Sequence, residues 1–123
     1  MPIFIPPYVL PSQPYDLFAF YPGVPLASAV LLYVKMVRSV VLPINLTGSL
    51  AGALTAATAS TTLNIQKNGT TIGTIIFAAA GTVGTFTFTT AITFVAGDVL
   101  SVIAPSVPDS TLALLNLTLT GTR

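Results

Sequence analysis

The stretch LNIQKNGTTIGTIIF, residues 63–77, decides the fold class. Apolar and polar side chains alternate in its first half, which is the two-residue period of a β-strand. The pair Asn68-Gly69 then separates two strand-like runs, and it favours a type I′ turn because both central residues of that turn need a positive φ. Gly73, inside the second run, is typical of a β-bulge. The stretch therefore predicts an antiparallel hairpin.

Strand signals continue from this hairpin toward the C-terminus. Residues 85–89 (TFTFT) predict an amphipathic strand with its rings inward and its hydroxyls outward. Residues 115–120 alternate leucine with Asn or Thr, which is again a strand pattern. Between them, Ala96-Gly97-Asp98 predicts a turn into a strand at residues 99–104, and two prolines then enforce a loop.

The pattern is weaker upstream of the hairpin. Residues 30–37 are mostly apolar at both parities, which predicts a strand that is covered on both faces or bulged near Lys35–Arg38. Residues 47–60 are small and indicate a loop with a short strand. We therefore expect residues 29–123 to form an all-β domain of seven or eight strands without a helix, as an antiparallel β-sandwich or jelly roll.

The first 28 residues differ in composition and predict an extended, Pro-rich N-terminal arm. Seven of the ten prolines lie at or before Pro25, and proline disfavours helix. Large apolar side chains alternate with these prolines, and an extended arm cannot bury them by itself. Two interpretations stay open: the arm closes a sheet edge of its own domain, or it binds a neighbouring subunit or another protein. The candidate binding residues of the arm are Phe4, Tyr8, Tyr15, Phe18, Phe20 and Tyr21.

The composition excludes most catalytic chemistry. Only 6% of the residues are charged, where a soluble domain carries about 25%. The chain has no His, no Cys and no Glu, so it lacks an imidazole, a thiolate and a Glu general base. Three scattered Asp residues give neither a carboxylate pair nor a metal site. We expect no enzymatic activity, no catalytic residue, no bound metal and no cofactor.

Charge and hydropathy bear on the partners. A net charge of +1 gives no basic surface for nucleic acid. The mean hydropathy is +0.89, yet the uncharged stretch at residues 17–34 contains Pro22, Gly23 and Pro25, which would break a membrane-spanning helix. We therefore expect neither nucleic-acid binding nor membrane insertion. A surface of threonine in place of lysine and glutamate indicates self-association, because few charges guard the strand edges.

Three segments carry a resemblance to a protein family. Leu63–Phe77, Phe94–Pro105 and Leu117–Arg123 resemble strand-and-turn segments of small β-rich virion proteins of tailed bacteriophages. The similarity runs from about Tyr15 to the C-terminus. It implies a non-enzymatic structural role as a capsid-decoration, baseplate or tail-fibre component, commonly homotrimeric.

The expected function combines the arm and the resemblance. The chain is expected to be a virion structural protein that assembles with copies of itself, as a homotrimer, and that attaches through its arm to other capsid or tail proteins. The alternative is a carbohydrate-binding or host-receptor module of a tail fibre or baseplate. In that case the loops at residues 78–84 and 105–111 would form the recognition surface.

Overall fold

The computed structural model describes residues 12–123, and this part of the chain is built almost entirely of β-strands. One turn of 3-10 helix, η1 (Ile44–Leu46), interrupts them. The strands are β1 (Pro14–Tyr21), β2 (Val30–Lys35), β3 (Val40–Leu42), β4 (Leu50–Thr55), β5 (Thr61–Lys67), β6 (Thr70–Phe77), β7 (Gly84–Thr87), β8 (Ile92–Phe94), β9 (Val99–Ile103) and β10 (Ala113–Thr122). The all-β prediction is confirmed.

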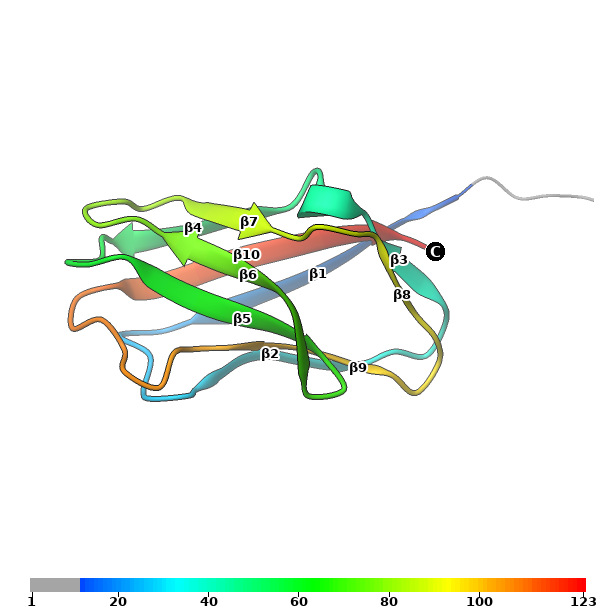
Figure 1. Ribbon diagram of the computed structural model, residues 1–123, viewed down its shortest axis with the longest axis horizontal. Coiled ribbons are helices and arrows are strands. Elements are labelled where there is room, and N and C mark those ends of the chain that lie inside the picture. The colour runs from blue at the N-terminus through cyan, green and yellow to red at the C-terminus, as the bar shows by residue number, and fades with distance from the viewer. Residues whose placement is uncertain (1–11) are drawn as a thin grey trace, which may run out of the picture.

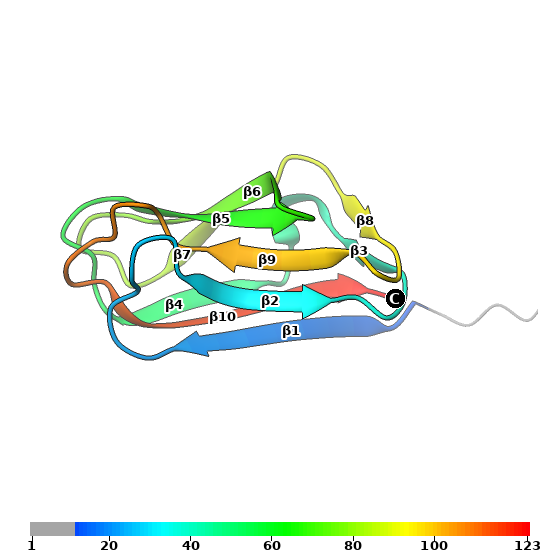
Figure 2. The same cartoon turned by 90° about the horizontal axis from the view of Figure 1, so that it is seen from below.

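The strands form two antiparallel sheets of five strands each (Figures 1 and 2). Sheet A has the order β1-β10-β3-β8, with β4 also paired to β10, and sheet B has the order β2-β9-β5-β6-β7. The expected number of seven or eight strands is wrong: the described residues form ten. β3 and β8 have only three residues each, too few to display a period, and β1 lies within the predicted arm.

A single hydrophobic core holds the two sheets together. Buried side chains from both sheets belong to one cluster. The largest fully buried side chains are those of Phe77, Phe88, Phe94, Met36, Leu42, Leu46, Leu63, Ile65, Ile75, Leu100, Leu112 and Leu115. Since the chain has no cysteine, burial of these groups is the main source of stability.

The predicted hairpin is confirmed as β5–β6. Lys67 pairs with Thr70, and the two turn residues have positive φ, +50° at Asn68 and +84° at Gly69. The register shifts between Ile65 and Gln66, directly opposite Gly73, so the predicted bulge is present. A Cβ at Gly73 would lie 2.7 Å from the Thr87 backbone oxygen. The glycine therefore serves both the bulge and the close approach of β7.

Replacing Gly73 with alanine should test this close approach. Because backbone as well as a side chain blocks the added methyl group, we expect a loss of about 1–3 kcal/mol in the free energy of unfolding. Urea denaturation at fixed protein concentration measures this loss. Thr71→Ala, at an exposed position of the same strand, is the matched control and should change stability much less. Equal stability of Gly73→Ala and wild type would contradict the packing described.

The irregularity of the β2 region lies in a different place from the one predicted. The strand ends at Lys35, and its bulge falls between Val30 and Leu32 rather than near Lys35–Arg38. The shift in register lets two consecutive side chains, Leu31 and Leu32, both be buried. The bulge accounts for the adjacent apolar residues Leu31 and Leu32, whereas Tyr33 and Val37 of the same run are exposed. The short strand expected within residues 47–60 is β4.

The predicted arm, residues 1–28, is divided in the structure. Residues 14–21 form β1, which pairs with β10 over its whole length, so the sheet begins at Pro14 and not at residue 29. Of the two interpretations of the arm, the one in which it closes a sheet edge of its own domain describes residues 14–21. Residues 1–11, with Phe4 and Tyr8, lie outside the described residues.

The termini of the described chain and four of its loops lie at opposite ends of the molecule. Gln13 and Arg123 pair through two backbone hydrogen bonds, so both termini of the described chain lie at one end (Figure 1). The loops at residues 22–29, 56–60, 78–83 and 104–112 gather at the opposite end, which we call the loop end (Figure 2). No helix within residues 12–123 is long and apolar enough to cross a membrane.

Candidate interaction surfaces

The three carboxylates of the chain serve different local structures. Asp16 accepts a hydrogen bond from the Thr120 hydroxyl, between β1 and β10. Asp98 belongs to a turn, and Asp109 to a loop, each with its own set of donors. Within the described residues, no group of three or more His, Cys, Asp or Glu residues could hold a metal ion.

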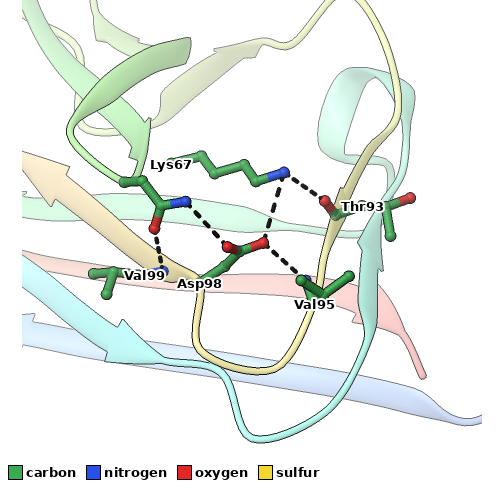
Figure 3. A network of polar contacts seen from close by, with 6 residues as sticks. Lys67, Thr93, Val95, Asp98 and Val99 are labelled. Atoms are coloured by element: carbon green, nitrogen blue, oxygen red, sulfur yellow. Dashed lines mark hydrogen bonds and ion pairs between the residues drawn. The ribbon is translucent and has the colours of Figure 1, made fainter.

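Asp98 connects two turns at the end opposite the loop end. Its carboxylate accepts a hydrogen bond from the Val95 backbone N–H (2.9 Å), as Figure 3 shows. It accepts another from the Asn68 side-chain amide (3.0 Å). Lys67 Nζ lies 3.7 Å from the same carboxylate and donates a hydrogen bond to the Thr93 backbone oxygen. The Val95 N–H, followed by the Asn68 amide, lowers the pKa of Asp98. The cluster fastens the β5–β6 hairpin to the turn before β9.

Asp109 organises the loop end. Its carboxylate accepts hydrogen bonds from the Thr58 hydroxyl (2.6 Å) and from the backbone N–H groups of Thr58, Ala59, Thr111 and Leu112. The Thr58 hydroxyl, followed by the Thr111 N–H, lowers the pKa of Asp109 far below its ordinary value. Both oxygens are occupied by these donors. The residue therefore braces two loops and has no free lone pair for catalysis.

The lowered pKa values of Asp98 and Asp109 make stability depend on pH. Because the unfolded chain holds these protons more tightly than the folded chain, acid favours unfolding. The melting temperature should be steady down to about pH 5 and fall progressively below about pH 4. Differential scanning calorimetry measures this course. Asp109→Asn should have a lower melting temperature than wild type at pH 7, and its melting temperature should fall less on acidification. A pH dependence equal to that of wild type would contradict the role given to Asp109.

A hollow of about 520 Å³ opens at the loop end. It includes most of the predicted recognition loop 105–111 but none of residues 78–84. Hydroxyl groups and proline rings make up much of its wall, and the lining residues are Thr58, Ala59, Ser60, Thr61, Thr62, Pro105, Val107, Pro108, Asp109 and Ser110. Its volume lies within the usual range for small-ligand sites.

The outer face of sheet A carries a group of exposed apolar side chains. On β1, Phe18 and Phe20 are 79% and 61% exposed, and we call this pair the aromatic flank. Across β10, Leu50, Leu54 and Val83 are 75%, 75% and 72% exposed, and we call them the aliphatic flank. Asn116, Thr118 and Thr120 of β10 lie between the two flanks and form the polar stripe. Asp16 is the single charged residue of β1, β4 and β10.

The strand β4 of the aliphatic flank directs its larger side chains outward. In β4 the small residues Ala51 and Ala53 are buried while Leu50 and Leu54 face solvent. The reason is space, because a Cβ at Gly84 of β7 would already lie 2.9 Å from the Ala51 Cβ. This close contact of β4 with β7 leaves no room for larger inward groups. The leucines are therefore free for contact with another surface.

The structure separates the predicted arm residues into two groups. Tyr15 and Tyr21 are partly buried and pack against the core of their own domain, whereas Phe18 and Phe20 point away from it. The aliphatic flank was missed in the sequence. The signal in the sequence was the alternation of leucine with alanine or glycine in residues 50–54. Large apolar groups are usually assumed to face the core, so this pattern alone does not show that the leucines face solvent.

The outer face of sheet B has a different character. Its exposed aromatic side chain is Tyr33, which stands in one row with Ser101 and Gln66. Polar side chains such as those of Asn64 and Thr87 occupy further positions of this face. Ser101 is buried, and the partly buried Ile76 and Ile103 pair with Thr62 and Asn64 on the same face, so this face mixes polar and apolar groups.

No protein-family model, curated protein or solved structure matches this chain. The resemblance to virion proteins of tailed phages therefore stays a prediction. What the chain can do follows from its own surfaces.

Proposed function

We propose that the protein is a non-enzymatic structural component of a tailed-phage virion, on the exterior of the capsid or in a fibre, that assembles with copies of itself. We infer further that its two sheets form a β-sandwich of the jelly-roll type, since one core cluster holds buried residues of both. The observation that carries the self-assembly is the outer face of sheet A, where five large apolar side chains are exposed around uncharged polar groups. Large apolar side chains that gather on one face, instead of being scattered singly, are typical of an interaction site.

The chemistry of the chain supports a structural role. The described residues include all three aspartates, and the two with lowered pKa values serve as hydrogen-bond acceptors for loops and turns. Folding thus uses the acidic groups that an enzyme would need for acid–base steps. The scarcity of charge removes repulsion between copies.

The position of the N-terminal segment supports attachment through it. The described chain begins at the end of the molecule that carries Gln13 and Arg123, opposite the loop end. A protein held there would present its loop end outward. Since β1 is part of sheet A, the attaching segment is restricted to residues 1–11, and a truncation that tests attachment has to stop before Pro14.

Virion particles purified from cells that make the full chain or a chain of residues 12–123 test this proposal. Quantitative mass spectrometry should find many copies of the full chain per particle and few or none of the shorter chain. Circular dichroism of the shorter chain should match that of the full chain, which excludes misfolding as the cause. Particles without the full chain, or equal incorporation of both chains, would refute the proposed attachment.

The hollow at the loop end favours a second candidate function, recognition of a host glycan or receptor. Hydroxyl groups of Ser60 and Ser110 can exchange hydrogen bonds with a sugar, and the prolines offer apolar contact. A glycan array with the purified full chain tests this function. Binding that is lost in Ser60→Trp, which would fill the hollow, supports it, and an array without hits excludes glycans as the ligand.

A further inference from the structure

The pairing registers of sheet A set the two flanks at matched heights. Phe18 pairs with Thr118, and Thr118 pairs with Leu50, so these three residues form one row across β1, β10 and β4. The next row runs from Phe20 through Asn116 to Gly52 and then, through an isolated bridge, to Val83. Paired residues project to the same face of a sheet. Each ring of the aromatic flank thus has an aliphatic counterpart at its own level.

We propose that neighbouring copies associate with the aromatic flank of one copy against the aliphatic flank of the next, around an axis parallel to β10. Rotation about such an axis does not change the height of a residue along the strand. Phe18 of one copy therefore meets Leu50 of the next, and Phe20 meets Gly52 and Val83. The inference rests on the proposed self-assembly and identifies its contact surface.

A ring of three copies satisfies both flanks of every copy. Three sheets that face a common axis place each aromatic flank beside the aliphatic flank of one neighbour, so the contact closes without a free apolar edge. The polar stripe, Asn116, Thr118 and Thr120, then lines the axis, where its hydroxyl and amide groups can bond across copies or to water. The same pairing also closes for two copies, so the choice of three copies per ring rests on the homotrimer expected from the resemblance to phage virion proteins.

Charge and shape favour a second copy of this chain as the partner that covers the outer face of sheet A. The rows that contain the flanks carry no charged side chain, and Asp16 is the single charge in the strands of this face, so repulsion between identical faces is small. Phe20 and Gly52 stand in one row, so a ring faces a position that has no side chain of its own and lies beside the Asn116 amide. A partner of another chemistry would not reproduce both the absence of charge and the fit of a ring opposite Gly52.

Engineered cysteines test the pairing directly, since the natural chain has none. Phe18→Cys and Leu50→Cys chains are produced together, with different tags, and oxidised with copper phenanthroline. We expect a disulfide between one chain of each kind as the main product, and little product from either chain alone. A chain that carries both substitutions should form cross-linked species that end at three chains in denaturing, non-reducing gels.

Controls separate the possible outcomes. Tyr33→Cys with Thr87→Cys, on the outer face of sheet B, should give no more product than random collision. If Phe18→Cys forms a disulfide with itself as readily as with Leu50→Cys, aromatic flanks face each other and the proposed pairing is wrong. If the cross-linked species of the chain with both substitutions end at two chains, the threefold ring is wrong. An oligomeric wild type without the mixed disulfide overturns this inference alone, whereas a monomeric wild type also overturns the proposed self-assembly.

Discussion

Phe94→Ala should lower the free energy of unfolding by about 3–5 kcal/mol, the range for loss of a buried ring. Phe94 is completely buried on β8, a strand of only three residues that pairs with β3. Its ring also lies 5.4 Å from Lys67 Nζ, so the substitution removes a cation–π contact as well. Since small domains have a free energy of unfolding of about 5–15 kcal/mol, the substitution would remove a large share of it.

Chemical denaturation at one protein concentration measures this effect, because association would otherwise change the midpoint. Val107→Ala, at a residue that is 83% exposed, is the matched control and should stay within about 0.5 kcal/mol of wild type. If Phe94→Ala does not fold, Phe94→Leu should fold with a smaller loss. Wild-type stability in both Phe94 variants would show that β8 does not pack as described.

Phe18→Ser combined with Phe20→Ser should dissociate the assembly while leaving the domain folded. Both rings point away from the core, so their loss leaves no cavity. Aromatic side chains at the centre of an interface each contribute about 2 kcal/mol or more, and their joint loss weakens association about a thousandfold. Native mass spectrometry over a dilution series measures the shift toward the 12.7 kDa monomer.

Tyr33→Ser is the control for this double substitution. It removes an exposed aromatic ring from the outer face of the other sheet and should leave the assembly unchanged. Circular dichroism shows whether each variant keeps its strands. Dissociation by Tyr33→Ser, or an unchanged assembly after loss of both phenylalanines, would place the contact elsewhere.

The parts of the fold that depend on local signals could be predicted from the sequence. Asn68-Gly69 defines its hairpin because the turn itself requires positive φ at adjacent residues. The alternation of leucine with polar residues in β10 likewise gives the correct inner and outer faces. In both cases the residues that carry the signal are neighbours in the chain.

Other parts depend on contacts between distant segments and could not be predicted. β1 has large apolar residues at both parities, because Leu17 faces the core while Phe18 and Phe20 face outward, so its period is hidden. The candidate interface requires that β1 and β4 lie on either side of β10. No local pattern contains this order, and the sequence therefore predicted aromatic binding residues without their aliphatic counterparts.

Sedimentation equilibrium of the wild-type chain over a wide concentration range tests self-assembly most directly. The proposed ring of three copies predicts a mass three times that of the 12.7 kDa chain, which persists on dilution into the micromolar range. A single species of 12.7 kDa at the highest concentrations would contradict it, because five exposed apolar side chains on sheet A would then remain in water without a partner.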